Sequence, residues 1–312
     1  MNIGLISAAT YKYGDAPARN GSNHGTAFAS TFNGFDEAEV KKHEWTFVRA
    51  QETIEGAKVT KVWDRDKFWA ERLAKACSIP TVADTPEECA DGVDVVIIVD
   101  DGSGEQSKYA AHPLKNGIPV FCDKPLAMTG RKAKAVADLA KQTGTPFMSS
   151  SSLRFVPDIL NLKEQVSEIG PVRLAQTICG NELVYYGIHA LSMAYAVFGG
   201  GAVSAVNVGQ PGMNIVRIRF DDHRDVVLMV GEREWMRAGY QISLFGQKAW
   251  ATVKPDLKNL YWYLLKEFMN YVKTGKEPYP IDQEVELIAA LEAGKISLKE
   301  NREVEIAEVL GG

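Results

Sequence analysis

The sequence predicts an α/β protein with two domains, the first built on a doubly wound parallel sheet and the second on largely antiparallel strands. Three observations support this fold class. The chain has 312 residues, about twice the roughly 150 residues of an ordinary domain. Up to residue 150, short apolar runs alternate with amphipathic stretches, as in parallel sheets with helical crossovers. From residue 151 to 312, strand-like runs follow one another at hairpin spacing.

The apolar runs of the first part place its elements in order. Buried strands are expected at residues 2–7, 58–63, 94–99, 119–122 and 146–149. Apolar residues at helical spacing predict helices at 68–76, 105–116 and 131–141. A further helix opens near His24, with Ser22 or Asn23 as its N-cap, and residues 10–22 and about 34–56 are interpreted as insertions. Ligands of such sheets bind beyond the carboxyl ends of the strands, so the residues after each strand are the candidates for chemistry.

The second part combines helices with a series of hairpin-like strands. Helices are expected at residues 158–167 and 187–198, with a strand at 172–179 between them. Further strands are expected at 202–208, 214–220, 225–230, 241–245 and 249–253, before two closing helices at 260–274 and 282–299. The four serines at 149–152 are interpreted as a tight strand exit near the domain junction.

Composition and charge argue against several classes of protein. With 35 basic and 40 acidic residues, the formal charge is −5, which argues against nonspecific nucleic-acid binding and against a polybasic membrane surface. No apolar run reaches the roughly 18 residues of a membrane span, and the first residues lack the basic start of a secretory signal. Four cysteines without CxxC spacing predict reduced thiols rather than disulfides or a metal site. We therefore expect a cytoplasmic protein.

The turn after the first strand departs from the glycine-rich pattern of dinucleotide-binding domains. Its residues are Ser7, Ala8, Ala9 and Thr10. Ser7 and Ala9 stand where the GxGxxG fingerprint has its first two glycines, and each Cβ would crowd a nearby diphosphate. Replacement backbone contacts are expected from Gly14, Gly21 or Gly25.

Acidic residues follow two of the expected strands. Asp64 would accept hydrogen bonds from the hydroxyls of an adenosine ribose and repel a 2′-phosphate, which favours NAD over NADP. The neighbouring Arg65 would offset that repulsion, and a helix N-cap is the alternative role of Asp64. Asp100 and Asp101 either bind ribose hydroxyls or substrate, or form a solvated strand exit.

One stretch, residues 93–129, joins a buried strand, a helix, the turn Asn116-Gly117, a second strand and the tripeptide Asp123-Lys124-Pro125. With the later segments 154–157 (RFVP), 170–171 (GP) and 187–190 (GIHA), it resembles the Gfo/Idh/MocA oxidoreductase family over most of the chain. The resemblance implies an N-terminal Rossmann domain over residues 1–150. It also implies a C-terminal α/β domain over 151–312 with an open, largely antiparallel mixed sheet, used for substrate binding and homo-oligomer contacts.

The resemblance assigns chemistry to two residues. Lys124 would lie between a nicotinamide and the substrate, and His189 would exchange the proton of the reacting hydroxyl. Alcohol oxidation removes a hydride from carbon and a proton from oxygen, so a base is required, and an ammonium group stabilises the developing negative charge. The family commonly has Asp four residues before the histidine; here Tyr185 would donate a hydrogen bond to substrate or imidazole instead. A surface lysine, a structural histidine and a packing tyrosine are the alternatives.

The remaining expected contacts complete the predicted site, which includes no metal. Cofactor contacts are expected from Ser7, Ala8, Ala9, Thr10, His24, Asp64, Arg65, Asp100, Asp123, Lys124 and Pro125. Substrate contacts are expected from Arg154, Glu182 and Tyr186.

The sequence thus favours an oxidoreductase that uses NAD, with NADP as the alternative, on a hydroxyl or carbonyl of a sugar, cyclitol or related small molecule. Two other classes stay open. An NAD-dependent glycosidase of the same fold would retain NAD and show no net reduction. A ligand-sensing protein without catalysis would account for the missing glycines and for Tyr185, whereas Lys124 and His189 together favour an enzyme.

Overall fold

The computed structural model describes residues 1–12 and 17–311, and the chain folds into two compact units. The first unit comprises Met1–Leu126, Val136–Ser149 and Tyr261–Pro278, and the second comprises Ala127–Ala135, Ser150–Leu260 and Tyr279–Gly312. One of these divisions falls between Ser149 and Ser150, one residue before the boundary expected after residue 150. Residues 127–135 belong to the second unit and residues 261–278 to the first, whereas a single boundary at residue 150 would assign them the other way round. Gly14, one of the glycines expected near a diphosphate, lies outside the described residues.

The first unit is built on a six-stranded parallel sheet. Its strands, in spatial order, are β5 (Thr81–Val82), β4 (Lys58–Trp63), β1 (Asn2–Ile6), β6 (Val95–Ile98), β7 (Val120–Cys122) and β8 (Phe147–Ser149). The chain runs from β1 toward β5 on one side and from β6 to β8 on the other, so the strand order reverses between β1 and β6. This is a doubly wound Rossmann sheet, and the predicted fold class is confirmed.

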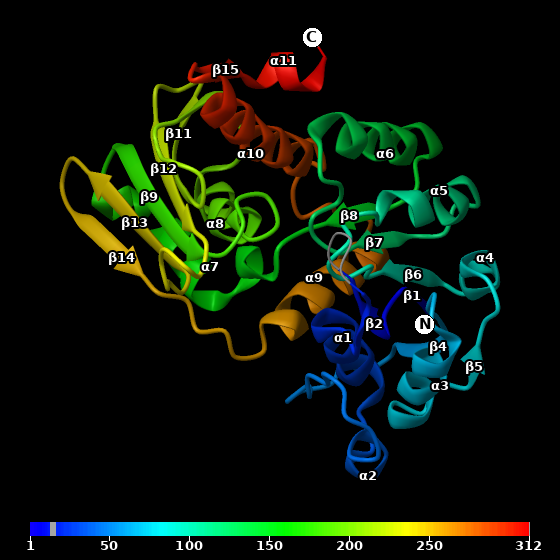
Figure 1. Ribbon diagram of the computed structural model, residues 1–312. Coiled ribbons are helices and arrows are strands. Elements are labelled where there is room, and N and C mark those ends of the chain that lie inside the picture. The colour runs from blue at the N-terminus through cyan, green and yellow to red at the C-terminus, as the bar shows by residue number, and fades with distance from the viewer. Residues whose placement is uncertain (13–16, 312) are drawn as a thin grey trace. The chain divides into compact units, whose positions relative to one another are not determined.

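Helices lie on both sides of this sheet (Figure 1). They are α1 (Asn23–Asn33), α2 (Glu37–Val40), α3 (Lys67–Ala76), α4 (Pro86–Ala90) and α5 (Ser107–Lys115), and α6 (Gly130–Thr143) follows β7. The expected N-cap of α1 is Ser22, whose Oγ accepts the Gly25 N–H at 2.9 Å. A short hairpin, β2 (Thr10–Tyr11) and β3 (Arg19–Asn20), occupies the first insertion.

Helix α9 (Leu260–Thr274) follows the second sheet in sequence but packs within the first unit. The ring centroids of Phe268 and Phe121 are 5.5 Å apart, and Tyr261 lies 5.5 Å from Phe28. Phe268 is fully buried. The aromatic side chains of this helix therefore pack in the core of the first unit, which explains why residues 261–278 belong to that unit.

The second unit contains a seven-stranded mixed sheet. Its strands, in spatial order, are β14 (Trp250–Val253), β13 (Gln241–Gly246), β9 (Val172–Gly180), β12 (Asp225–Gly231), β11 (Met213–Phe220), β10 (Ala202–Asn207) and β15 (Val304–Glu305). The pair β9 and β12 is parallel, and the other described pairs are antiparallel. Each strand expected in this part is present; β15 and the closing helix α11 (Ile306–Leu310) are additional.

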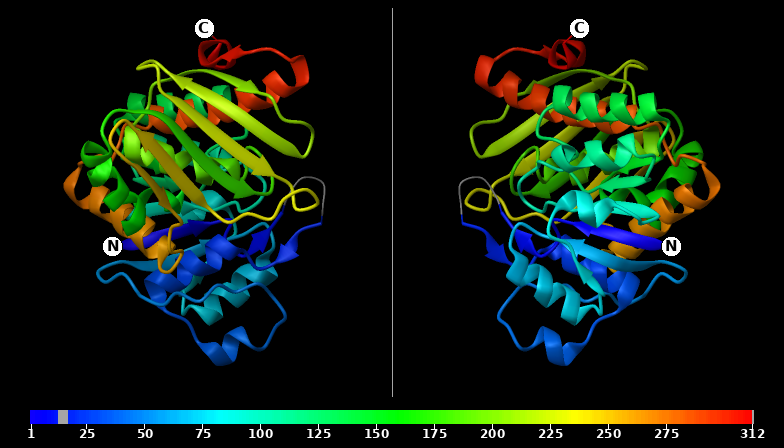
Figure 2. Two further views of the ribbon diagram at one scale, coloured as in Figure 1. Left: turned by 90° about the vertical axis from the view of Figure 1, so that its left-hand side faces the viewer. Right: turned by 90° about the vertical axis from the view of Figure 1, so that its right-hand side faces the viewer.

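One face of this sheet is covered by helices α7 (Pro157–Ile169), α8 (Gly187–Phe198) and α10 (Asp282–Glu300), and a 3₁₀ turn (Ser152–Phe155) precedes α7. Alternate residues of β11 and β12 are buried, as expected for strands with one covered face. The left view of Figure 2 looks onto the other face, where the strands lie in front of the helices.

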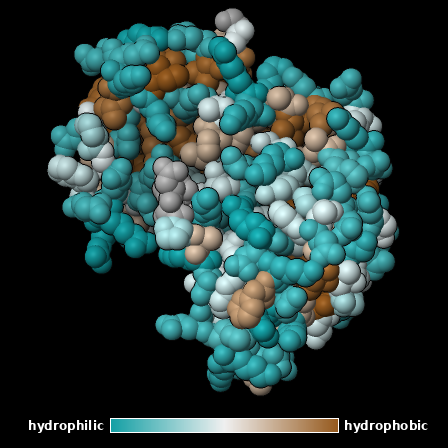
Figure 3. Space-filling model, turned by 45° about the vertical axis from the view of Figure 1, so that its right-hand side comes forward, coloured by the Kyte–Doolittle hydropathy of each residue, from teal (hydrophilic) through white to brown (hydrophobic). Residues whose placement is uncertain are grey.

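The face drawn in Figure 3 is largely hydrophilic, with apolar side chains gathered in separate patches. Among the described residues, no helix combines the length and apolar character that crossing a membrane requires. The four cysteines, Cys77, Cys89, Cys122 and Cys179, are buried free thiols.

Candidate active site

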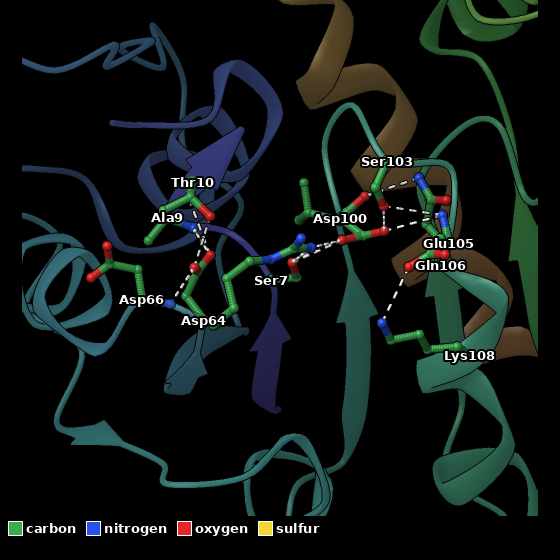
Figure 4. A network of polar contacts seen from close by, with 12 residues as sticks. Ser7, Ala9, Thr10, Asp64, Asp66, Asp100, Ser103, Glu105, Gln106 and Lys108 are labelled. Atoms are coloured by element: carbon green, nitrogen blue, oxygen red, sulfur yellow. Dashed lines mark hydrogen bonds and ion pairs between the residues drawn. The ribbon is translucent and has the colours of Figure 1, made fainter. Parts of the chain in front are cut away.

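In the first unit, the carboxyl ends of β1 and β6 meet where the strand order reverses. Ser7 follows β1 and Asp100 follows β6, and the Ser7 hydroxyl donates to Asp100 Oδ1 at 3.1 Å. Their backbone φ angles are 55° and 41°, in the left-handed region that non-glycine residues rarely adopt. Figure 4 shows both residues in one polar network. Non-glycine residues with left-handed backbone conformations are concentrated at functional sites. This edge of the sheet is therefore the candidate ligand site of the unit.

Asp64, directly after β4, holds the turn that follows β1 (Figure 4). Its Oδ2 accepts the N–H groups of Ala9 at 2.8 Å and Thr10 at 3.1 Å. Its Oδ1 accepts the Thr10 hydroxyl at 2.8 Å and the Asp66 N–H at 3.0 Å. Burial raises the pKa of Asp64, and these hydrogen bonds lower it. Four hydrogen bonds use the acceptor positions of a carboxylate, so Asp64 organises the turn, a role that the sequence pattern does not reveal.

Helix α1 begins close against this turn because Gly25 lacks a side chain. A Cβ on Gly25 would lie 2.0 Å from the carbonyl oxygen of Ala8, far inside contact distance. Close packing of helix and strand is the role of the third glycine in the dinucleotide fingerprint. The turn therefore keeps one of the three glycine functions, although Ser7 and Ala9 replace the other two.

The donors at the start of α1 bind a carboxylate of the chain itself. Asp101 Oδ2 accepts the Ser22 hydroxyl at 2.9 Å and the His24 N–H at 3.4 Å. A helix N-terminus favours anions because its N–H groups and its macrodipole present positive charge. Asp101 thus takes hydrogen bonds that dinucleotide-binding domains commonly give to a diphosphate.

Arg65 is engaged inside the same network. Its Nη2 forms an ion pair with Asp100 and donates to Ser7 Oγ at 3.3 Å. Asp100 Oδ2 also accepts the Ser103 hydroxyl, and the Glu105 N–H at 3.1 Å. The guanidinium of Arg65 is consequently tied to Asp100 rather than open to a 2′-phosphate.

The tripeptide after β7 carries two buried charged side chains. His24 Nδ1 lies 2.5 Å from Asp123 Oδ2. Lys124 is buried, and this burial lowers its pKa, whereas the negative charges of Asp123 and Asp101 raise it. Pro125 follows Lys124 across a cis peptide bond. The first unit therefore brings together the expected His24, Asp123 and Lys124.

One buried acceptor at this edge has no hydrogen-bond partner among the described residues. The Nε2 of Gln106 donates to the carbonyls of Val99 at 3.1 Å and Lys124 at 3.5 Å, while its Oε1 accepts nothing. An unsatisfied buried acceptor is costly, and a ligand amide would satisfy it. Together with the Gly25 packing and the α1 donors, this acceptor fits a dinucleotide at the sheet edge once Asp101 is displaced from α1.

In the second unit, His189 is held by a serine. It lies in the first turn of α8, and its Nδ1 is 2.7 Å from Ser151 Oγ, with both side chains buried. Ser151 Oγ also accepts the Leu153 N–H at 3.2 Å. The sequence pattern misses Ser151 because it belongs to a serine run and lies 38 residues from its partner.

The turn that leads into α8 contains three expected site residues. Glu182 Oε2 accepts the Tyr185 N–H at 2.5 Å, so Glu182 stabilises this turn. The buried ring of Tyr185 lies 5.6 Å from that of Tyr186. Tyr186 in turn lies 6.1 Å from the imidazole of His189. The structure thus brings Tyr186 to His189, while the proposed roles of Tyr185 in catalysis and Glu182 in substrate binding stay predictions.

A cavity of about 440 Å³ lies beside two tyrosines that neighbour His189, although His189 does not line it. Tyr186 and Tyr240 line it, and the ring of Tyr240 lies 5.4 Å from the imidazole. Tyr240 is not predicted from the sequence because a loop far along the chain brings it here. The cavity lies within the 300–1,000 Å³ or so that is usual for small-molecule sites.

Arg154, expected to contact substrate, packs instead beside α10. Its Nη2 donates to the Gln283 side chain, and its guanidinium lies 3.5 Å from the centroid of the Tyr279 ring. It is not among the residues that line the cavity. The neighbouring Glu284 is fully buried, and neither carboxylate oxygen has a hydrogen-bond partner in the described part of the chain. This burial raises the pKa of Glu284 to about 7, and the charge of Arg154 opposes the increase.

Comparisons with known proteins agree with this architecture. Residues 22–151 match the model of an oxidoreductase family with an NAD-binding Rossmann fold, Gfo/Idh/MocA. The chain is 32% identical over 124 residues to the NAD⁺-dependent scyllo-inositol 2-dehydrogenase of Bacillus subtilis, covering 38% of this chain and 35% of that enzyme. It is 24% identical over 215 residues to inositol 2-dehydrogenase 2 of Saccharopolyspora erythraea, covering 62% and 63%. These matches therefore span between about one third and just under two thirds of the curated relatives.

Solved structures match over nearly the whole chain. Myo-inositol dehydrogenase from Lactobacillus casei, determined with NAD(H) and myo-inositol, has a TM-score of 0.77 at 14% identity, covering 97% of this chain and 96% of that one. Myo-inositol 2-dehydrogenase from Lactobacillus plantarum also has a TM-score of 0.77, at 15% identity and coverages of 97% and 98%. At such identities the likeness shows the shared fold. The family match covers residues 22–151, so the Rossmann part of the chain is similar to the Gfo/Idh/MocA oxidoreductase family.

Proposed function

We propose that the protein is an NAD-dependent oxidoreductase that oxidises a hydroxyl of a cyclitol, sugar or related polyol, or reduces the corresponding carbonyl. The match of residues 22–151 to an NAD-binding oxidoreductase family and the inositol dehydrogenases among the similar proteins support this reaction class. The observation that carries the proposal is the buried His189, oriented by Ser151 beside a cavity of small-molecule size.

The side chains divide the chemistry between them. A nicotinamide, when bound, accepts or supplies the hydride. His189 takes the proton of the reacting hydroxyl, and Ser151 orients the imidazole through Nδ1. Lys124 stabilises the negative charge that develops on the reacting oxygen, and its burial strengthens that interaction. Tyr186 and Tyr240 present phenol groups to the cavity, which suit a substrate with several hydroxyls.

NAD is the proposed cofactor. The turn held by Asp64, the start of α1 and the acceptor of Gln106 would hold it. Because Arg65 is paired with Asp100, its charge is less available to offset the repulsion between Asp64 and a 2′-phosphate. NAD⁺ is therefore expected to bind more tightly than NADP⁺.

The uncovered face of the second sheet supports a homo-oligomer. Leu174 lies opposite Phe245 in the β9–β13 pair, and Phe245 lies opposite Trp250 in the β13–β14 pair. These three side chains are 42%, 42% and 71% exposed in the single chain, which leaves an apolar row across three strands. A second copy of the chain would cover it. The buried thiols also suit the reducing cytoplasm, the proposed location.

The test is the formation of reduced nicotinamide from NAD⁺ or NADP⁺ with a panel of cyclitols, sugars and sugar acids. We expect absorbance of NADH to appear with at least one polyol, and faster with NAD⁺ than with NADP⁺. Tightly retained NAD with turnover of a glycoside but no net reduction would favour the glycosidase instead. A folded protein that binds neither dinucleotide would overturn the proposal.

A further inference from the structure

The cavity beside His189 has a wall with an unusual charge. It is formed at the carboxyl ends of the parallel strands β9 and β12 and by the loop that leads into β13. Its lining residues are Gly180, Asn181, Tyr186, Arg233, Met236, Arg237, Ala238, Gly239 and Tyr240. Two of them are arginines and none is acidic. Glu232 and Glu234 belong to the same loop but do not line the cavity.

Within the described part of the chain, neither Arg233 nor Arg237 forms an ion pair or a hydrogen bond through its side chain. Other arginines of the same unit are paired, for example Arg217 with Glu303 at 2.9 Å and Arg219 with Asp225 at 3.0 Å. Two unpaired guanidinium groups on one cavity wall create a local positive potential that attracts an anion.

The loop that carries these arginines is anchored at its start. The Glu232 N–H donates to the Gly212 carbonyl at 2.8 Å, and the Trp235 and Met236 N–H groups both donate to the Glu232 carbonyl at 2.9 Å. Trp235 packs on Gly212, where a Cβ would lie 2.4 Å from the indole nitrogen. This turn holds the segment between Arg233 and Arg237 in a defined conformation, which reduces the entropy lost when a ligand binds.

Two tyrosines of the cavity wall lie close to the proposed proton acceptor. Tyr186 and Tyr240 line the cavity and hold their rings within 6.1 Å and 5.4 Å of the imidazole of His189. Burial raises the pKa of Tyr240, so its phenol stays protonated and remains a hydrogen-bond donor at neutral pH. The wall therefore offers guanidinium and phenol donors, and the imidazole of His189 lies next to its two tyrosines without lining the cavity itself.

From this arrangement we infer that the substrate is an anionic polyol, a sugar or cyclitol that carries a carboxylate or a phosphate group. Arg233 and Arg237 bind the anionic group, and the hydroxyls reach Tyr186, Tyr240 and His189. Guanidinium groups suit this task because their planar donors match the oxygens of carboxylate and phosphate in pairs. The inference rests on the proposed oxidoreductase function and adds the charge of its substrate.

Calorimetric titration of the full chain with bound NADH tests the inference with three probes: myo-inositol, D-glucuronate and myo-inositol 1-phosphate. We expect at least one charged probe to bind more tightly than myo-inositol. Arg233→Gln and Arg237→Gln should each weaken the binding of that charged probe by about tenfold and leave the affinity for myo-inositol unchanged. Arg219→Gln, which removes an arginine that does not line the cavity, is the matched control and should bind all three probes as the wild type does.

Preference between glucuronate and inositol phosphate identifies the anionic group. Equal binding of neutral and charged probes, or arginine variants with unchanged affinity for the charged probe, would overturn the inference while leaving the oxidoreductase function intact. Arginine-dependent binding of a charged probe without any NADH formation from NAD⁺ would support the anion site and count against the proposed reaction.

Discussion

Ser151 Oγ lies 2.7 Å from Nδ1 of His189, and both side chains are buried. A hydroxyl can either donate to Nδ1 or accept from it, whereas a carboxylate can only accept. The hydroxyl at Nδ1 of His189 is therefore a neutral partner, and it comes from the segment after β8 rather than from the turn before α8.

Ser151→Ala should lower kcat by roughly tenfold with little change in KM, because it frees the imidazole to rotate without touching substrate contacts. Ser151→Thr, which keeps the hydroxyl, should recover most of the activity. Ser150→Ala is the control, since the Ser150 hydroxyl donates to the Ser151 carbonyl and not to the imidazole. Unchanged kcat in Ser151→Ala would show that this hydrogen bond has no part in turnover.

Asp101→Asn should tighten the binding of NAD⁺ and of ADP-ribose by about tenfold. Asparagine keeps the shape but removes the negative charge that competes with a diphosphate at the start of α1. Isothermal titration with both ligands measures the change. Asp91→Asn, at an exposed aspartate paired with His112, should bind as the wild type does. Weaker binding by Asp101→Asn would instead show that Asp101 contacts the dinucleotide directly.

Glu284 should make stability depend on pH. Its pKa rises from the ordinary value of 4.5 to about 7 on folding, because the carboxyl is buried without hydrogen-bond partners in the described chain. The folded state therefore binds more protons than the unfolded state, and stability falls as pH rises from 4.5 toward about 7. The full shift corresponds to roughly 3 kcal/mol at 1.36 kcal/mol per pKa unit.

Glu284→Gln should accordingly stabilise the protein by about 3 kcal/mol near pH 8 and by little near pH 5, as measured by urea unfolding at both values. Glu286→Gln, on the same helix, is the contrasting variant. Its Oε1 accepts the Tyr195 hydroxyl at 2.7 Å and the N–H groups of Gly201 and Ala202 at 2.8 Å, so its loss should destabilise at both pH values. An equal effect of Glu284→Gln at the two pH values would refute the assigned titration.

Phe245→Glu should reduce the mass of the protein in solution from that of an oligomer toward that of one chain. The substitution places a charge in the apolar row formed with Leu174 and Trp250. Light scattering after size exclusion measures the mass, and Lys254→Glu, at an exposed position just after β14, is the control. A wild-type protein that is monomeric at all concentrations would contradict the proposed interface.

The sequence predicts the fold well because apolar periodicity is local. The main strands and the helices around them are predicted from apolar runs such as residues 94–99. Strand β5 is not predicted, because a strand of two residues is too short to show a periodic pattern. The site is harder to predict. Asp64 is expected to meet a ribose, but which donors surround it depends on how Ala9 and Thr10 fold back, 55 and 54 residues away.

The partners of His189 show the same limit. Ser151 lies within a run of identical residues, and Tyr240, Arg233 and Arg237 lie in a loop whose place near α8 depends on strand pairing in the second sheet. Arg154 is the reverse case, because its motif suggests substrate contact but its side chain packs on Tyr279 and Gln283. Long-range pairing, rather than local pattern, decides these contacts.

Isotope transfer tests the central claim most directly. The protein is incubated with NAD⁺ and a panel of polyols and sugar acids deuterated at their hydroxyl-bearing carbons, and the reduced cofactor is analysed by mass spectrometry. We expect the wild type to form NADH that carries deuterium at the nicotinamide C4 position, and we expect this rate to fall roughly 10²–10⁴-fold in His189→Asn. NADH without deuterium, or equal labelling by wild type and His189→Asn, would contradict it.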